Sequence, residues 1–242
     1  MKKSIQFIAL VLVVLSSAII ASANPLSIAT ATGDKTVVTQ VRTVSSFHAI
    51  KVSGGIDVEL SQGNGQKVQV VADENVISQI RTEVKDGVLN IFTEGSIRNA
   101  QTMEVHLTFQ QLDAITASGG CDIESEQKLN FATLKLDISG GCDLELKCKA
   151  ENLICSQSGG CDVELTGEAQ NGSFNVTGGC DMKASEFYLK NCTVDASGGS
   201  DVSVNASVEL TITATGASDV NYYGKPAKIT KSAHGASDIN AR

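Results

Sequence analysis

Apolar and polar residues alternate with a period of two along most of the chain. Leu134, Leu136 and Ile138 alternate with lysine and aspartate, and the alternation resumes from Cys142 to Leu146 after a pair of glycines. A period of two places successive side chains on opposite faces of a strand, whereas a helix would show a period of 3.6. The pattern predicts an all-β protein built of strands with one buried face.

A short glycine corner interrupts this alternation eight times. Its form is Ser/Thr-Gly-Gly/Ala-x-Asp, and the last copy begins with histidine instead of the hydroxyl residue. The first glycines of the corners are Gly54, Gly119, Gly140, Gly159, Gly178, Gly198, Gly216 and Gly235. From Gly119 onward they stand 21, 19, 19, 20, 18 and 19 residues apart. A constant period near 20 residues is typical of solenoid proteins.

Each repeat is predicted to form one coil, in which two short strands meet at the corner and its first glycine adopts a positive φ. Stacked coils would pair in parallel about 4.8 Å apart, and parallel connections favour a right-handed path. The sequence therefore predicts a single-stranded right-handed parallel β-helix, or β-solenoid, of about 19–20 residues per coil over residues 111–242.

Residues 36–110 are less regular and are interpreted as an N-terminal β region that holds the first coil and a cap. Asp86-Gly87 predicts a hairpin between residues 81–85 and 88–93. The run that begins at Asp73 indicates a short helical turn through Ile80. Residues 36–242 would form one continuous domain. An exposed end of a β-stack templates aggregation, so we expect a partner, a neighbouring subunit or the short tail to cover the C-terminal end.

The first residues have the three parts of a secretory signal. Two lysines precede the apolar run 7–15, and small residues lead to Ala21-Ser22-Ala23. Residues 1–23 are therefore interpreted as a signal peptide and 24–35 as a tether. The alternative, a membrane anchor, needs about 20 apolar residues. We expect an exported protein, located in the periplasm, at the outer-membrane surface or outside the cell, with no membrane span after cleavage.

The formal net charge of −8 argues against nucleic acid as a partner, because nucleic-acid binding requires a basic face.

The cysteines follow the phase of the strands. Cys121, Cys142, Cys161 and Cys180 occupy the same inward position of successive corners, and Cys148, Cys155 and Cys192 also fall on inward positions. One interpretation is a ladder of free thiols that fills a narrow apolar corner. The alternative is a set of strained disulfides between coils. A zinc site would need a Cys-x2-4-Cys pair, which the chain lacks.

The corner aspartates should form an outward column, in which neighbouring like charges repel. One interpretation is that each carboxylate accepts hydrogen bonds from the glycine N–H groups and the corner hydroxyl. The alternative is a calcium site, because carboxylate oxygens bind Ca²⁺, although the known nonapeptide calcium repeats recur every nine residues. The calcium candidates are Asp122, Asp143, Asp162, Asp181, Asp201 and Asp219.

No catalytic set can be assembled from the sequence, because its three histidines, His48, His106 and His234, lie far apart. Tyr188 and Tyr223 are the plausible exposed aromatics for sugar contacts. The leading hypothesis is a non-enzymatic binding module that presents a β-face to a glycan or a protein at the cell surface, with homo-oligomers through the solenoid ends as a further expectation. The alternatives are a structural component of the cell envelope and a polysaccharide-acting enzyme.

Several runs together resemble a known family. They are residues 47–54, Ala72 to Asn75, Asp86 to Leu89, the ordered series of corners, and Tyr223-Gly224-Lys225-Pro226. Over residues 40–240 the chain resembles the putative auto-transporter adhesin head GIN domain family, a domain of unknown function common in exported Bacteroidetes proteins. The resemblance implies a right-handed parallel β-helix, an envelope or extracellular location, an adhesin role and no catalytic residues. Cysteine at the corner departs from the small residue usual there.

Overall fold

The computed structural model describes residues 30–32 and 36–242. The predicted signal peptide, residues 1–23, and most of the predicted tether lie outside the described residues. Within the tether range, β1 (Thr30–Thr32) pairs in parallel with β8 (Ser96–Arg98). At least these three residues are therefore part of the fold.

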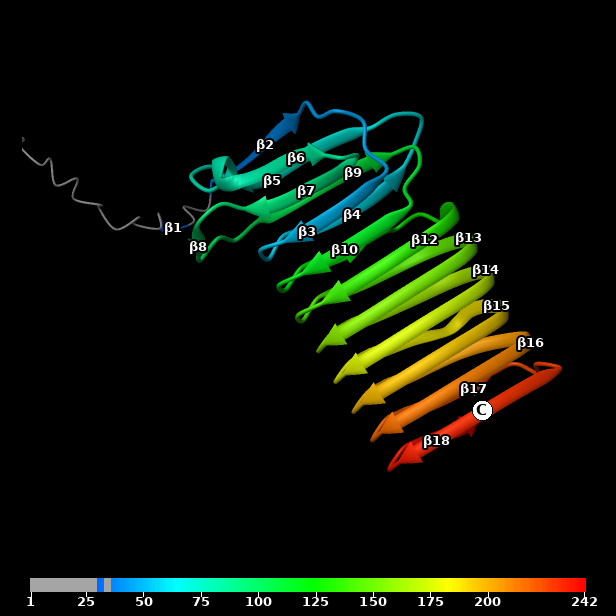
Figure 1. Cartoon of the computed structure of the whole chain (residues 1–242). Coiled ribbons are helices and arrows are strands. Elements are labelled where there is room, and N and C mark those ends of the chain that lie inside the picture. Colours follow the sequence, from blue (N-terminus) through cyan, green and yellow to red (C-terminus); the bar gives the residue numbers. More distant parts are fainter. Residues whose placement is uncertain (1–29, 33–35) are drawn as a thin grey trace, which may run out of the picture.

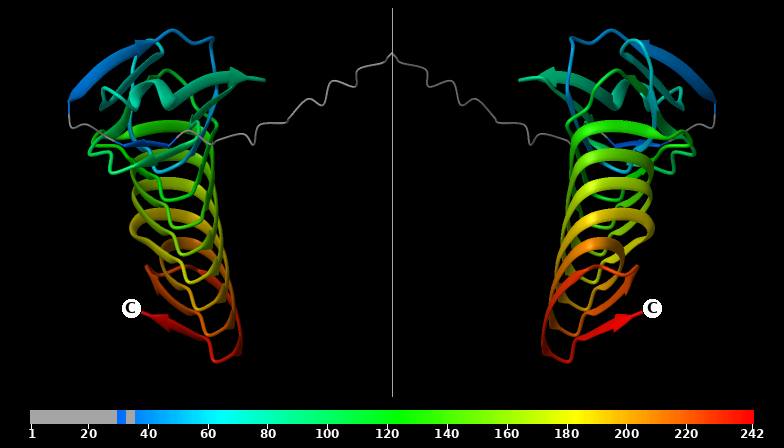
Figure 2. Two further views of the ribbon diagram at one scale, coloured as in Figure 1. Left: turned by 90° about the vertical axis from the view of Figure 1, so that its left-hand side faces the viewer. Right: turned by 90° about the vertical axis from the view of Figure 1, so that its right-hand side faces the viewer.

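The molecule is a β-solenoid of about seven turns, so the predicted fold class is confirmed (Figure 1). Its strands are β3 (Ala49–Ser53), β4 (Asp57–Gln62), β10 (Ala114–Ser118), β11 (Asp122–Glu124), β12 (Leu129–Ser139), β13 (Asp143–Gly159), β14 (Asp162–Gly178), β15 (Asp181–Gly198), β16 (Asp201–Gly216), β17 (Asp219–Tyr223), β18 (Lys228–Gly235) and β19 (Asp238–Ala241). Each pairs in parallel with the equivalent strand of the next coil, and equivalent corner residues are direct partners, as Asp143 is of Asp162. The coils stack along one axis (Figure 2).

Each of β13 to β16 is a single long strand with a bend in its middle. In β13 the buried and exposed residues alternate as far as Ala150, then two successive residues, Glu151 and Asn152, stay out of the core before Leu153 is buried. The prediction of two short strands per coil was wrong for these coils, because hydrogen bonding to the neighbouring coils continues through the bend, whereas β11 and β12, and β17 and β18, are separate strands. The bend divides the wall into two sheets, one before and one after each glycine corner.

The glycine corner has the backbone that the sequence predicted. The first glycine has a positive φ in all eight corners, for example +100° at Gly178 and +86° at Gly198. The next N–H donates across the coils, from Gly179 to the carbonyl of Gly159 at 2.9 Å and from Gly199 to that of Gly178 at 2.8 Å. A side chain on the first glycine would occupy the space through which these bonds pass.

The core is the interior of the coil. Its inward positions hold aliphatic residues, phenylalanine, alanine and cysteine in columns that run along the solenoid axis. One column passes through Leu136, Cys155, Phe174, Val194 and Ile212, which are direct partners in successive coils. All five are buried. The predicted phase of the strands is confirmed by this burial.

The cap precedes and covers the first coils. Its elements are β2 (Val37–Arg42), β5 (Lys67–Asp73), a 3-10 helix η1 (Ile77–Gln79), β6 (Ile80–Lys85), β7 (Val88–Thr93), β8 and β9 (Met103–Phe109). β7 and β9 pair in parallel with β3 and β4, whereas β5, β2 and β6 are antiparallel additions. The predicted hairpin is confirmed by the β6–β7 pairing, with Asp86 at a φ of +52°. The predicted helical turn is confirmed only over Ile77–Gln79, which form η1, because Asp73, its expected first residue, still belongs to β5.

Candidate functional site

The corner aspartates form the expected column on the sheet that follows the corners. Asp122, Asp143, Asp162, Asp181, Asp201 and Asp219 are direct partners in series, and Asp181 is the only one of these six that is not fully exposed. No group of three or more histidine, cysteine, aspartate or glutamate side chains in residues 30–32 and 36–242 is arranged to hold a metal ion. The column thus presents one aspartate carboxylate per coil, and the calcium hypothesis stays a prediction.

The hydrogen bonds at the corners differ from the predicted ones. The glycine N–H groups donate to carbonyls of neighbouring coils, not to aspartate. The corner hydroxyls turn away from the carboxylates as well: Ser139 donates to the carbonyl of Ala117 at 3.3 Å, and Thr215 to that of Ala196 at 3.4 Å. The corner donors bond to backbone carbonyls of neighbouring coils and not to the aspartates, so the predicted local turn motif was wrong.

An acidic hollow lies where the aspartate column meets the cap. It has a volume of about 280 Å³ and is lined by carboxylates of β4, β9 and β11 together with one imidazole. Its polar side chains are Asp57, Glu59, Glu104, His106, Asp122 and Glu124. Among the described residues, no lysine or arginine lines it, so five carboxylates share the hollow with one imidazole.

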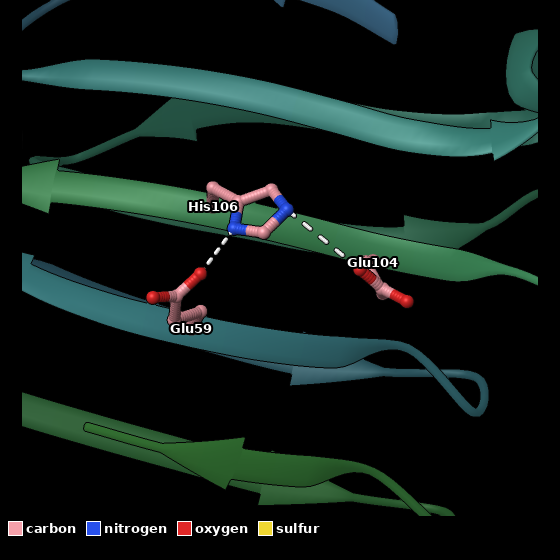
Figure 3. Close-up of polar contacts among 3 residues, drawn as sticks. All are labelled: Glu59, Glu104 and His106. Carbon is pink, nitrogen blue, oxygen red and sulfur yellow. Dashed lines mark hydrogen bonds and ion pairs between the residues drawn. The ribbon is translucent and has the colours of Figure 1, made fainter. Parts of the chain in front are cut away.

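His106 is held between two carboxylates of the hollow (Figure 3). Its Nδ1 bonds to Glu59 across the β4–β9 pair, and its Nε2 lies 3.7 Å from Glu104 Oε2. Glu59 and His106 are 47 residues apart in the chain and become direct partners only because β9 pairs with β4. Both ring nitrogens face carboxylates, and the carboxylates of the hollow repel one another.

Asp57 experiences that repulsion most directly. Partial burial raises the pKa of its carboxyl, and the charges of Asp122, Glu104 and Glu124 raise it further. The ionised carboxylate is therefore disfavoured in the folded state. Its cost is fully present above the folded pKa and disappears as the pH falls below the ordinary value of 3.8.

We expect Asp57→Asn to stabilise the protein at pH 7 by up to about 1 kcal/mol, since the group is partly exposed and solvent screens its charge. The gain should shrink as the pH falls through the raised folded pKa and disappear below the ordinary value of 3.8. Thermal unfolding of both proteins between about pH 3 and pH 8 measures this. Asp195→Asn is the control, because Asp195 lies between Asn175 and Thr213 and has no carboxylate partner. A gain at Asp57 that is equal at both ends of the pH range would contradict the assignment.

All seven cysteines are buried free thiols in the structure. The four corner thiols each donate to the carbonyl three residues earlier, as Cys161 does to Ser158 at 3.3 Å. In later coils serine makes the same bond from the same place, for example Ser200 to Ser197 at 3.2 Å. Burial raises the pKa of Cys148 and of Cys192 to about 12 and also raises that of Cys155. A protonated, buried thiol is a poor nucleophile, and the interpretation of the cysteines as packing residues stays a prediction.

The sheet before each corner has a different outer surface, which we call the hydroxyl face. From β13 to β16 its outward residues are Ile154, Ser156, Ser158, Ser173, Asn175, Thr177, Thr193, Asp195, Ser197, Thr211, Thr213 and Thr215. Asp195 is the only formally charged residue among them. The opposite sheet carries the aspartate column with further glutamates and lysines, and we call its outer surface the charged face. The two faces therefore differ strongly in charge.

A row of asparagines borders the hydroxyl face at the bend of the coils. Asn171 donates to Asn152 and Asn191 donates to Asn171, each at 2.9 Å. In the next coils the row continues as Glu209, bonded to Lys228 at 2.6 Å. Beside the row lies a shallow groove of about 470 Å³ that spans four coils and is lined mainly by apolar surface. The groove and the asparagine row were not predicted from the sequence, although asparagine recurs at residues 152, 171 and 191.

The groove combines three kinds of surface. Ile154, 41% exposed, is part of its apolar floor. Asparagine amides border one side, and Ser173 and Thr193 supply hydroxyl groups. Of the two tyrosines expected at the surface, Tyr188 is 61% exposed and Tyr223 is partly buried. Both belong to the sheet that carries the charged face. The groove therefore has apolar and neutral hydrogen-bonding groups but no aromatic platform among its lining residues.

No helix within residues 30–32 and 36–242 has both the length and the apolar character needed to cross a bilayer.

Comparison with known proteins adds a family and a set of related folds. The family model described as putative auto-transporter adhesin, head GIN domain, matches residues 46–226. The structure is similar to a putative adhesin from Bacteroides fragilis, with a TM-score of 0.81 and 21% identity over 87% of this chain and 99% of that one. A putative lipid binding protein from Parabacteroides distasonis has a TM-score of 0.72 and 21% identity, over 88% and 100% of the two chains.

A third solved structure, a putative adhesin from Parabacteroides merdae, gives a TM-score of 0.69 and 21% identity over 88% of this chain and 99% of that one. At this identity the likeness establishes a shared fold. A search of curated proteins finds no match.

Proposed function

Because this chain belongs to the family of putative auto-transporter adhesin head GIN domains, we propose that it is a non-enzymatic exported adhesin whose hydroxyl face binds a neutral glycan. The location we propose is the periplasm, the outer-membrane surface or the extracellular space. The observation that carries the proposal is the groove along the asparagine row, beside the outward residues of β13 to β16, which hold one formal charge in a protein of net charge −8.

The chemistry of the groove suits a neutral sugar chain. Serine and threonine hydroxyls and asparagine amides both donate and accept hydrogen bonds, as sugar hydroxyls do. Its apolar floor would contact the C–H faces of a sugar ring, and binding sites commonly combine such a floor with a few polar groups. The parallel coils repeat these groups about every 4.8 Å, so an extended polymer could contact several coils at once.

Rigidity favours the same role. The hydroxyl face belongs to strands that are paired on both edges from β12 to β16. A surface that is ordered before binding loses little conformational entropy when the ligand arrives. A stiff solenoid can therefore bind through many small contacts without a deep pocket.

We expect Ser173→Lys to weaken glycan binding about tenfold or more, which corresponds to about 1.4 kcal/mol. The long cationic side chain would cover the groove beside Asn171 and Ile154. The matched control is Thr166→Lys, which adds the same group to the same strand on the charged face. Binding to an array of neutral glycans, followed by titration of the best ligand, measures the effect.

The other functions predict other results. Selective binding to proteins, with no glycan bound, would indicate that the ligand is a protein surface. No binding of either class would favour a structural role in the envelope, and shortening of a polysaccharide during incubation would indicate an enzyme. Equal loss of binding in the two lysine variants would contradict the assignment to the hydroxyl face.

A further inference from the structure

The strands β18 and β19 each have one edge without a partner among the described residues. Within residues 30–32 and 36–242, β18 pairs only with β16, and β19 only with β17. Nearly every residue of β18 is exposed, including Ile229 at 40%. An unpaired edge of this kind offers backbone donors and acceptors to any further strand, and the nearest available strand in solution belongs to a second copy of the chain.

A lysine interrupts the apolar interior at this edge. The column that holds Leu136, Cys155, Phe174, Val194 and Ile212 continues in β18 with Lys231, the direct partner of Ile212. The neighbouring inward positions of β18 remain apolar, since Ile229 follows Leu210 and Ala233 follows Ala214. The change to a charged residue is thus confined to the central column of the final coil.

The ammonium group of Lys231 has defined partners. Its Nζ donates to the hydroxyl of Tyr222 at 2.9 Å and lies 4.5 Å from the centre of the Tyr222 ring. Tyr222 is 7% exposed and is an inward residue of β17. The lysine therefore lies across the open end of the core, where its charge is stabilised by the ring face and still reaches water.

We propose that Lys231 keeps the C-terminal end of the solenoid closed to a second copy of this chain. A strand from another molecule paired with β18 would enclose the ammonium between two coils and remove it from water. Burial of a charge without an anionic partner is strongly unfavourable. Inward-pointing charges on edge strands prevent edge-to-edge association in this way. The proposal differs from the expectation from sequence that homo-oligomers form through the exposed solenoid ends.

Lys231→Ile tests the proposal, because it restores the residue type of Ile212 and leaves the edge itself unchanged. The matched control is Lys228→Ile. Lys228 is on the same strand, points outward and pairs with Glu209, so this variant also exchanges one lysine for one isoleucine. Size-exclusion chromatography with light scattering, over a range of concentrations, measures the mass of each protein.

The expected result is a monomeric native protein, a monomeric Lys228→Ile variant, and a Lys231→Ile variant whose mass rises with concentration to about twice that of the monomer or more. Hydrogen exchange should then show new protection of the β18 amides. Lys231→Met, which keeps an unbranched chain without the charge, is the second variant if the isoleucine protein does not fold. A folded Lys231 variant that stays monomeric would overturn the proposal, as would native protein that already associates through β18.

Discussion

Gly198→Ala is expected to destabilise the solenoid by about 3 to 5 kcal/mol. Gly198 has a φ of +86°, a conformation that alanine adopts only with strain. A Cβ at this position would lie 2.6 Å from the carbonyl oxygen of Gly178 and 2.9 Å from its nitrogen, both of them backbone atoms of the adjacent coil. The neighbouring corner would have to move. Thermal unfolding followed by circular dichroism should show a Tm lower by about 10 °C.

The adjacent residue provides the control. Gly199 has no positive φ, and a Cβ there would meet nothing within 4 Å. Alanine already occupies the equivalent place in the last two corners, at Ala217 and Ala236. Gly199→Ala should therefore change the stability by less than about 0.5 kcal/mol. If the two alanine variants were equally stable, the corner would not be built on the backbone of its first glycine.

Cys155→Ser is expected to cost about 2 to 3 kcal/mol, because it places a hydroxyl in an apolar site that offers no hydrogen-bond partner. The Cys155 side chain is 1% exposed and stacks between Leu136 and Phe174 in the central column. Its thiol makes no hydrogen bond with the described residues, unlike the corner thiols. Chemical denaturation monitored by circular dichroism measures the loss.

Cys161→Ser is the matched change at a corner. There the new hydroxyl can donate to the carbonyl of Ser158, as Ser218 does to that of Thr215 at 3.0 Å. We expect a change of less than about 0.5 kcal/mol. If the two substitutions destabilised the protein equally, serine would not be tolerated at this corner, although the later coils carry serine at the same place. A large cost at Cys161 alone would indicate that its thiol has a role beyond packing.

Much of the fold follows from two features of the sequence. The two-residue period of burial identifies the strands, and the corners centred on residues such as Gly140 and Gly159 recur at a nearly constant spacing. Together they determine which residues stack, because equivalent corners of successive coils become direct partners. The second bend could not be read in this way. In β13 it breaks the alternation by only one residue, at Asn152, and it carries no glycine or proline there, although Gly172 lies at the same bend of β14.

The candidate sites were harder to predict than the fold. The acidic hollow depends on the parallel pairing of β4 with β9, a strand that also pairs antiparallel with β5. No local signal in the sequence links Glu59 with His106. The asparagine row and Lys231, in contrast, can be found by aligning successive coils and comparing the residues at one equivalent position. This comparison needs the exact register of the strands, and the repeat length alone does not provide it.

The stacking itself can be measured as a series of distances between spin labels on the sheet that contains the hydroxyl face. Ser232 is joined to Asp137 through the partners Thr213, Asp195, Asn175 and Ser156, and the same line continues to Thr116 and Lys51. With one label at Ser232 and the other at Asp137, Thr116 or Lys51, pulsed electron spin resonance should give separations of about 24, 29 and 34 Å, one coil spacing of about 4.8 Å for each step. Separations that do not increase in even steps would contradict the stacked solenoid and, with it, the hydroxyl face.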